Sequence, residues 1–485
     1  MKKSSIWLDN IDFNINESLN KDIDVDVLII GGGITGLSIA YHLINSNLKV
    51  CLVEKNIVGH GVTARTTGKL TYLQELIYTK LDKTFGSEKA KLYLESQKEA
   101  IEIVESIIKE NKIDCDYEKV SSYVFTNNSK DIEKIKNEKK LLEKFNVEVN
   151  ECNKLPDLKE IEYGISVDDT AIFHPLKYLN GLKRICDNKI KIYENTKVVD
   201  INKEDNIFIC KTNKNNIKAK KVVLSLHYPY FLFPFLTPLK THLEKSYICA
   251  YETDKDYLFS AITSNKPTLS LRYLKSDKIY KIVLNQSHNL AFKNNDQEHF
   301  DKLIKSLKKE PDYIWSNKDI ITSDNLPYIG KIEENLFLAT GYNTWGMTNG
   351  SLAGKIISDM ILEKDNKYIE LFNPKRGLNS AKLINFPIDL VSNVKSFIGS
   401  KINKNKSWYD SRVIFETIDG KNVAIYIDEN DKKHIVYNKC PHLKCSLNFN
   451  EKEKTWDCPC HGSRFDIDGK CIEGPSNYDI VYKEK

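Results

Sequence analysis

The sequence predicts an α/β fold with a parallel sheet in its N-terminal part, followed by a smaller unit that carries paired cysteines and histidines. Three observations lead to this prediction. An apolar strand runs into a glycine-rich turn and a helical pattern at residues 25–44. Two short Cys/His stretches lie between residues 440 and 461. At 485 residues, the chain is long enough for two or three domains, each with its own core.

The N-terminal part has the order strand, glycine turn, helix, strand. The turn is G-G-G-I-T-G at 31–36, and the second strand ends at Glu54. Gly31 permits the tight turn, Gly33 lets the backbone approach a pyrophosphate, and Gly36 lets helix and strand pack closely. Unpaired N–H groups at the helix N-terminus then face the phosphates. This context predicts a Rossmann-type dinucleotide-binding fold, in which Glu54, 18 positions after Gly36, accepts hydrogen bonds from ribose hydroxyls.

Motifs further along the chain distinguish FAD from NAD as the dinucleotide. They are the loop G-H-G-V-T-A-R-T-T-G-K-L-T at 59–71, the segments 173–175 and 193–201, and a strand with a glycine-rich turn at 324–347. Together they resemble the family of FAD-dependent amine and D-amino-acid oxidases, over about residues 24–362. The resemblance implies FAD as the cofactor and an α+β substrate subdomain beside the Rossmann-type fold.

The same resemblance implies which residues bind FAD. Val198 would contact the adenine portion through its backbone. Gly341 and Gly346 would keep side chains away, so that backbone N–H groups reach the flavin oxygens. Arg65 stands where some relatives attach the flavin through a histidine, which disfavours a covalent link, although His60 lies nearby. The expected FAD-binding residues are Gly31, Gly33, Ile34, Thr35, Gly36, Glu54, Lys55, Arg65, Thr66, Thr67, Val198, Gly341, Gly346 and Met347.

The sequence offers few candidates for contact with the substrate. The segment 270–272 resembles a family strand that bears an arginine over the active site, and Arg272 could hold a carboxylate through two hydrogen bonds. A surface arginine is the alternative. Trp345 is the second candidate, more as a wall beside the flavin than as a reacting group. His174 and His288 are interpreted as structural residues.

The Cys/His stretches read C-P-H at 440–442 and C-P-C-H at 458–461, with fifteen residues between them. A Rieske [2Fe–2S] cluster needs two cysteines on one iron and two histidines on the other. A zinc site with the same four ligands is the alternative, but zinc fingers pair Cys with Cys and His with His. Here each stretch offers one of each. The pattern therefore favours a Rieske cluster held by Cys440, His442, Cys458 and His461.

The segment from about 413 to 481 resembles the Rieske fold of the respiratory cytochrome bc complexes, which implies a small all-β domain. Two further cysteines, Cys445 and Cys460, could join the cluster loops as a disulfide. In a reducing compartment this bond would survive only if it were shielded from exchange. Ser463 matches a serine that hydrogen-bonds a cluster sulfide. Phe465 replaces a usual tyrosine, and the lost hydroxyl predicts a lower cluster potential than in the respiratory proteins.

These patterns divide the chain into an FAD-dependent oxidoreductase unit at 1–376, an amphipathic linker at 377–406 and a Rieske domain at 407–485. Residues 387–399 could form a helix that packs between the domains. Membrane contact through this helix is less expected, because few of its residues are basic.

Composition excludes several classes of protein. The formal charge is only +5 and the charges are interspersed, so no nucleic-acid partner is expected. No apolar run reaches the roughly 20 residues of a membrane helix, and no signal peptide is evident at the N-terminus. Six of the eleven cysteines are scattered singly over the first 250 residues, which indicates reduced thiols and a cytoplasmic protein.

The sequence thus predicts an FAD-dependent dehydrogenase that oxidises an amine or amino-acid-like small molecule and passes electrons singly through the cluster to an external acceptor. Two alternatives stay open: a redox carrier or sensor without small-molecule turnover, and an O2-using flavin oxidase with a non-essential cluster. A Rieske oxygenase is disfavoured, because no D-x-x-H-x4-H pattern offers a mononuclear iron site. The substrate, the acceptor and the oligomeric state are not indicated.

Overall fold

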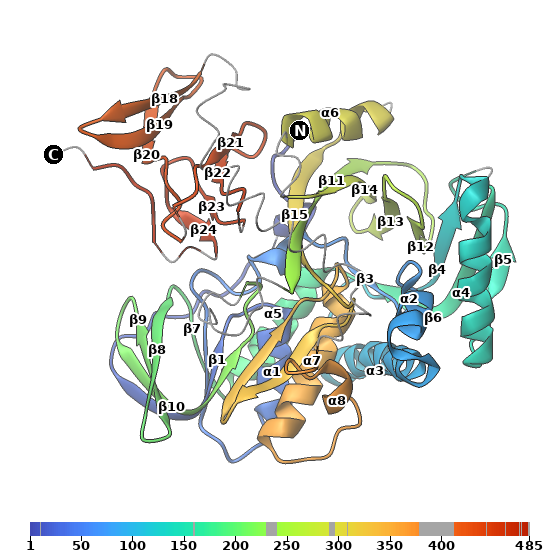
Figure 1. Cartoon of the computed structure of the whole chain (residues 1–485), viewed down its shortest axis with the longest axis horizontal. Coiled ribbons are helices and arrows are strands. Elements are labelled where there is room, and N and C mark those ends of the chain that lie inside the picture. The colour runs from blue at the N-terminus through green and yellow to red at the C-terminus, as the bar shows by residue number, and fades with distance from the viewer. Residues whose placement is uncertain are drawn as a thin grey trace.

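The computed structural model describes residues 1–9, 11–158, 161–228, 240–290, 296–307, 309–377, 412–442, 444–460, 462–474, 476 and 478–483. These residues form a large N-terminal unit, up to residue 377, and a small C-terminal unit, from residue 412 (Figure 1). The expected linker helix at 387–399 lies outside the described residues. Among the described helices, none is both long and apolar enough to cross a membrane.

The first sheet of the N-terminal unit is the predicted parallel sheet. Its strands are β1 (Ile23–Ile30), β2 (Val50–Val53), β7 (Lys191–Tyr193), β8 (Val198–Glu204), β9 (Ile207–Thr212), β10 (Asn216–Leu224), β16 (Tyr328–Glu333) and β17 (Leu336–Thr340). The central order is β16-β17-β10-β1-β2-β7, parallel from β17 to β7. Residues 27–30 of β1 are all buried, as expected for a parallel strand covered on both faces.

A layer of helices packs on this sheet. Helix α1 contacts both α7 and α5, and α3 contacts α7. The close approach of α1 and α7 depends on Gly354, because a Cβ there would lie 2.4 Å from the Cβ of Ser38. The helices are α1 (Ile34–Leu43), α3 (Ser87–Asn111), α5 (Pro175–Asp187), α7 (Gly346–Ile361) and the short α8 (Ile369–Phe372).

The second sheet belongs to the predicted α+β subdomain, which lies beside the α/β fold of the first sheet. Its strands are β3 (Lys69–Leu70), β4 (Glu118–Thr126), β5 (Asn150–Cys152), β6 (Tyr163–Ile172), β11 (Thr241–Glu252), β12 (Phe259–Thr263), β13 (Leu269–Lys275), β14 (Ile279–Asn289) and β15 (Tyr313–Thr322). The order is β15-β11-β14-β13-β12-β4-β6-β3, with β5 beside β6. Strand β15 therefore stands at one edge. Helices α2 (Ile77–Phe85), α4 (Ile132–Lys144) and α6 (Asp296–Leu307) accompany this sheet, and short 3-10 turns occur at Ile6–Leu8, Val62–Arg65 and Ser129–Asp131.

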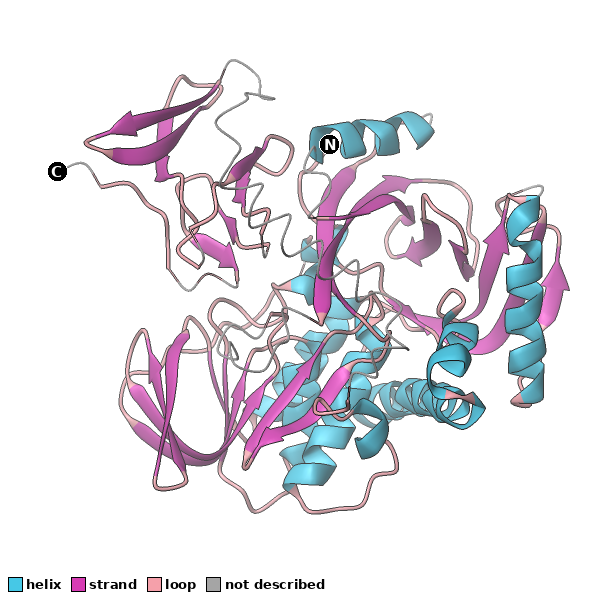
Figure 2. Cartoon of the chain, viewed as in Figure 1, coloured by secondary structure: helices cyan, strands magenta, loops and turns pink. Residues whose placement is uncertain are grey.

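The C-terminal unit contains only strands and loops among its described residues (Figure 2). One sheet has β18 (Val413–Ile418), β19 (Lys421–Ile427) and β20 (Lys433–Tyr437); the other has β21 (Asn448–Asn450), β22 (Thr455–Asp457), β23 (Arg464–Phe465) and β24 (Cys471–Glu473). Aromatic side chains fill its core, with Phe449 4.6 Å from Trp456 between ring centroids. This matches the small all-β domain that the resemblance implies.

The two units meet at the edge strand β15. Its side chains alternate, so Ser316 and Lys318 face the C-terminal unit while Asn317 and Asp319 face the interior of the N-terminal unit. Lys318 Nζ donates to the Gly462 carbonyl at 2.7 Å, and Ser316 N–H donates to Glu453 at 3.2 Å. One strand therefore separates the interior of the first unit from the loops of the second.

Candidate active site and metal centre

The glycine turn between β1 and α1 is a cradle without room for side chains. A Cβ on Gly36 would lie 1.9 Å from the carbonyl oxygen of Gly31, so only glycine allows α1 to start this close to β1. Gly31 itself has a φ of +112°. Gly33 caps α1 without a side-chain hydrogen bond, so no side chain of the cap residue competes with an anion at the helix N-terminus. The cradle fits a pyrophosphate group.

Glu54 is fixed at the end of β2 beside this cradle. Its two carboxylate oxygens accept hydrogen bonds from the N–H groups of Gly32 at 2.8 Å and Asn56 at 2.9 Å. Each oxygen keeps a further lone pair. The carboxylate can therefore accept hydrogen bonds from ribose hydroxyls, as the sequence predicts.

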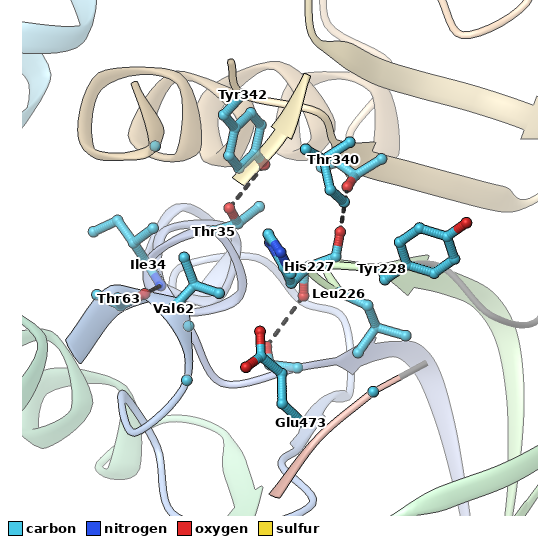
Figure 3. A pocket seen from close by; sticks show the side chains of 18 of the residues that line it. Ile34, Thr35, Val62, Thr63, Leu226, His227, Tyr228, Thr340, Tyr342 and Glu473 are labelled. Atoms are coloured by element: carbon cyan, nitrogen blue, oxygen red, sulfur yellow. Dashed lines mark hydrogen bonds between the residues drawn. The ribbon is translucent and has the colours of Figure 1, made fainter. Parts of the chain in front are cut away.

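A long cavity extends from the cradle to the turn between β17 and α7 (Figure 3). Twelve of the fourteen residues expected to bind FAD line it. The other two are Gly36, which packs against Gly31, and Thr67, which lines an adjoining cavity. The shape and the glycine cradle fit a dinucleotide.

Sequence reasoning missed several residues of this cavity. Thr35 Oγ1 lies 2.8 Å from the Tyr342 hydroxyl, which joins α1 to the turn after β17 (Figure 3). His227 follows β10, and its carbonyl accepts a hydrogen bond from Thr340 at 2.7 Å. Some of these positions lie within the motifs at 59–71, 193–201 and 324–347, but the motifs do not single them out, because each side chain lines the cavity through tertiary contacts. The lining residues not foreseen include Thr63, Thr196, His227, Tyr228, Asn317, Asp319, Tyr342 and Glu473.

The C-terminal unit also contributes to the wall of this cavity, through Ile472, Glu473 and Gly474. Burial alone would raise the pKa of Glu473, but Lys318, Arg65 and Arg464 lower it to about 2. Burial lowers the pKa of His227 to about 4. Glu473 is therefore an anion among cations, and His227 is neutral at physiological pH.

A second cavity adjoins the first and shares part of its wall, including Arg65, Asn317, Asp319 and Met347. Charged side chains line it, and two of them form an ion pair: Lys266 Nζ lies 2.8 Å from Glu244. The other charged or titratable lining residues are Arg65, Lys69, Glu75, Lys80, Tyr93, His242 and Asp319. A cavity with this lining is suited to a small polar substrate.

Lys69 is an unusual member of this set, because its ammonium is buried and donates to neutral groups. Its Nζ donates to the Ala261 carbonyl at 2.7 Å and to Ser270 Oγ at 2.6 Å. Burial lowers its pKa to about 7. Within the described part of the chain, no carboxylate pairs with it. One of its three N–H donors is left for a ligand in the cavity.

Asp319 lies where the two cavities meet. It stands directly opposite Glu244 in the β11–β15 ladder and accepts a hydrogen bond from Asn317 at 3.2 Å. Burial, together with the negative charges of Glu244 and Glu473, raises its pKa to about 7. Asp319 can therefore take up or release a proton near neutral pH.

The structure does not bring Arg272 into either cavity. Its guanidinium is fully buried and donates to the carbonyl oxygens of Gly68 at 2.6 Å and Phe173 at 3.0 Å. Through these hydrogen bonds Arg272 holds the loop after β2 in place, and its guanidinium does not face a substrate. Trp345 does line the second cavity, at the start of α7. His174 accepts a hydrogen bond from Lys177 N–H as the N-cap of α5, which confirms its structural role.

The candidate metal centre lies on two loops of the C-terminal unit. Cys440 and His442 precede β21, and Cys458 follows β22; His461 lies outside the described residues. Cys445 and Cys460 form a disulfide between the loops, and Cys458 Sγ lies within 4.8 Å of both its sulfurs. Both disulfide cysteines are buried, which meets the condition for surviving in a reducing compartment.

The two loops have the same backbone hydrogen bonds. Cys440 N–H donates to Cys445 O, and Lys444 N–H returns to Cys440 O, each at 2.8 Å. In the second loop, Cys458 N–H donates to Ser463 O at 2.7 Å, and Gly462 N–H returns to Cys458 O at 3.0 Å. The fold thus presents one cysteine from each of two equivalent loops, with His442 two residues after the first. This donor arrangement fits a [2Fe–2S] cluster with mixed ligands.

The position of Phe465 gives a testable prediction about the cluster potential. Phe465 is fully buried beside Trp456, its β22 partner, whereas Ser463 Oγ accepts a hydrogen bond from Ser476 N–H at 2.9 Å. The variant Phe465→Tyr restores one hydroxyl next to the cluster loops. One hydrogen bond of about 1 kcal/mol corresponds to about 40 mV for one electron. A redox titration should show a midpoint raised by about that amount; an unchanged or lower midpoint would contradict the interpretation.

Comparisons with known proteins agree with both sites. The family model of FAD dependent oxidoreductases (DAO) matches residues 26–360, and the model of the Rieske [2Fe-2S] domain matches residues 404–481. A Bacillus subtilis protein named as a Rieske 2Fe-2S iron-sulfur protein, YhfW, is 32% identical over 97% of this chain and 95% of its own length. Gamma-glutamylputrescine oxidoreductase of Escherichia coli is 25% identical over 71% of this chain and 85% of its own. Glycine oxidase from Geobacillus kaustophilus has the same fold, with a TM-score of 0.62 at 17% identity over 73% of this chain and 100% of that one.

Proposed function

Because the chain belongs to the family of FAD-dependent oxidoreductases and carries a C-terminal Rieske [2Fe–2S] domain, we propose that it oxidises an amino-acid-like amine and passes the electrons singly to an external acceptor. When bound, FAD accepts two electrons from a C–N bond, and the cluster carries one electron at a time. The single observation that carries the proposal is the charged second cavity, which shares a wall with the flavin cavity.

The proposal assigns Lys69 to the substrate carboxylate. Its buried ammonium has one donor left and pairs with no carboxylate among the described residues. A substrate carboxylate would supply the missing negative charge and raise the pKa of the lysine. Lys69 takes the role that the sequence suggested for Arg272, because Arg272 donates to backbone carbonyls instead.

The proposal assigns Asp319 to the substrate amine. An amine can lose its electrons only after its ammonium form has given up a proton. Asp319 Oδ stands between the two cavities, and its pKa near 7 suits it to accept that proton. Lys69 then orients the substrate while Asp319 holds the proton.

These roles predict a bell-shaped dependence of kcat/KM on pH, with its maximum near pH 7. Asp319 must be ionised, so the rate rises as pH increases through about 7. Lys69 must be charged, so the rate falls as pH increases through about 7. Asp319→Asn should remove the rising limb and lower kcat by about 100-fold or more. Lys69→Met should remove the falling limb and raise KM by about 10- to 100-fold. A rising limb that survives in Asp319→Asn would contradict the role of the carboxylate.

An anaerobic screen tests the proposed function as a whole. Purified protein is mixed with amines and amino acids while flavin and cluster absorbance are followed together. We expect the flavin absorbance to bleach first and the absorbance of the oxidised cluster to fall after it. A redox carrier or sensor would give no bleaching with any small molecule, and an oxidase with a non-essential cluster would bleach the flavin and leave the cluster oxidised.

The proposal also includes the division of the chain into domains and the location of the protein in the cell. The flavin unit is placed at 1–376, the linker at 377–406 and the Rieske domain at 407–485, in the cytoplasm. The small formal net charge of +5, with basic and acidic residues interspersed along the chain, supports no nucleic-acid partner.

A further inference from the structure

The two cluster loops face different surroundings. The second loop, residues 458–463, packs against the N-terminal unit. Lys318 Nζ donates to the Gly462 carbonyl at 2.7 Å, and a Cβ on Gly462 would lie 2.9 Å from Leu243. Just before this loop, Asp457 lies 2.9 Å from Lys245 of β11. This side of the metal centre is therefore closed by the flavin unit.

The first loop, residues 440–445, borders a shallow hollow whose described lining comes wholly from the C-terminal unit. In Figure 1, β18–β20 form the outer side of this unit, and β21–β23 lie nearer to β15. The hollow lies at the end of β19 and β20 where Lys421 faces the ring of Tyr437. The full lining is Gly420, Lys421, Asn422, Tyr437, Lys439, Pro441, Lys444, Asp479 and Ile480.

The rim of this hollow is positively charged. Lys421, Lys439 and Lys444 are all exposed, and none pairs with a carboxylate of the described residues. Lys421 Nζ donates instead to the Tyr437 hydroxyl at 3.3 Å. The one acid of the rim, Asp479, accepts a hydrogen bond from Cys471 N–H at 2.9 Å. The rim thus carries three ammonium groups and one carboxylate, and Lys439 and Lys444 stand within two residues of Cys440 and His442 in the sequence.

An exposed aromatic residue adjoins the same rim. Tyr478 is 67% exposed, the largest exposed fraction among the large apolar side chains of the described residues. Surfaces that bind proteins combine aromatic residues with a polar, charged rim. Complementary charge mainly increases the rate of encounter, which suits a brief electron-transfer contact.

We propose that this lysine-rimmed hollow docks an acidic one-electron carrier protein, which receives electrons beside the loop 440–445. The inference rests on the proposed function and adds the class of the acceptor and the surface that receives it. In each encounter one electron leaves the reduced protein and enters the oxidised metal centre of the carrier. No bond forms or breaks, and no proton is required.

The test uses the full-length holoprotein and two carriers of opposite charge. Plastocyanin, an acidic blue-copper protein, and mitochondrial cytochrome c, a basic haem protein, are the probes. Dissociation constants are measured by calorimetry with every partner oxidised, so this readout does not depend on turnover. The rate of carrier reduction is measured after photoreduction of the flavin, so no substrate is needed. Failure of the proposed substrate chemistry would therefore leave this test intact.

The variant is Lys439→Glu/Lys444→Glu. The matched control is Lys432→Glu/Lys433→Glu, which changes the charge equally at the opposite end of β19 and β20. Plastocyanin should bind the hollow variant on the order of tenfold more weakly, and the control should bind as the unchanged protein does. Salt should weaken binding to the unchanged protein.

Three results would overturn the inference. One is equal plastocyanin affinity for both double variants. Another is tighter binding of cytochrome c than of plastocyanin to the unchanged protein. The third is an unchanged rate of plastocyanin reduction in the hollow variant, which would place the exit of electrons elsewhere on the surface.

Discussion

Replacing Cys458 with serine is expected to abolish the cluster and to lower electron delivery to a one-electron acceptor by at least about 100-fold. Cys458 is buried, starts the second loop and lies within 4.8 Å of the sulfurs of the Cys445–Cys460 disulfide. A serine hydroxyl is not a thiolate and does not hold the iron. Reduction of the flavin by substrate should persist, because Cys458 lines neither cavity of the N-terminal unit.

Iron and sulfide content, the visible spectrum and FAD content check this expectation in one preparation. Cys471→Ser is the matched control. Cys471 lies in the same unit but on β24, and its Sγ lies 3.1 Å from the Ser476 carbonyl. The control should keep the cluster and the rate. If Cys458→Ser loses iron but reduces the acceptor at the original rate, the flavin reduces the acceptor directly and the cluster is not essential.

The parts of the fold that follow from local patterns were predictable. The apolar run before Gly31 and the spacing to Glu54 fix a strand, a turn, a helix and a strand, and the structure has β1, α1 and β2 at those places. The Cys/His spacing likewise indicates two equivalent loops. In each case the chemistry demands a residue type that few alternatives can replace.

The residues around the substrate were not predictable in the same way. Lys69 lines the second cavity because β3 pairs with β6, which is more than ninety positions away in the sequence. Burial raises the pKa of Asp319, and the negative charges of Glu244 across the β11–β15 ladder and of Glu473 of the other unit raise it further. Lys69 does stand in the loop motif at 59–71, but that motif gives no sign of a substrate contact, and Asp319 stands in none of the motifs. Arg272 is the opposite case. Its strand resembles one of the family and predicted a substrate contact, but in the structure its guanidinium donates to backbone carbonyls instead.

The contact between the two units was also beyond local reasoning. Lys318 and Gly462 are 144 positions apart, and Gly462 looks in the sequence like an ordinary turn glycine. In the structure Gly462 has a φ of +75° and lies against Leu243 and Lys318. The contact matters for function because Asn317 and Asp319, on either side of Lys318, line the flavin cavity.

Lys318→Met is therefore expected to loosen the C-terminal unit from the flavin unit without emptying either site. Lys318 is fully buried, and its Nζ donates to the Gly462 carbonyl at 2.7 Å and lies 4.0 Å from Asp457. Loss of one charged, buried hydrogen bond costs about 2 kcal/mol, or about a thirtyfold fall in the docked population. Asp457 keeps Lys245 and Arg464 as partners, so the C-terminal unit should still fold.

Two measurements separate loss of docking from loss of folding. Hydrogen exchange of the loop 458–463 and of β15 should increase, while exchange of the core strands β19 and β20 should not. After photoreduction, electrons should reach the cluster more slowly although FAD and iron contents are unchanged. Lys452→Met is the control, because Lys452 also joins the two units, 3.6 Å from Asp301, but through a pair in which Asp301 is largely exposed. Equal effects of Lys318→Met and Lys452→Met would show that the buried contact on β15 does not hold the loop in place. A slower transfer confined to Lys318→Met would mean that a single edge strand sets the spacing between the flavin cavity and the metal centre.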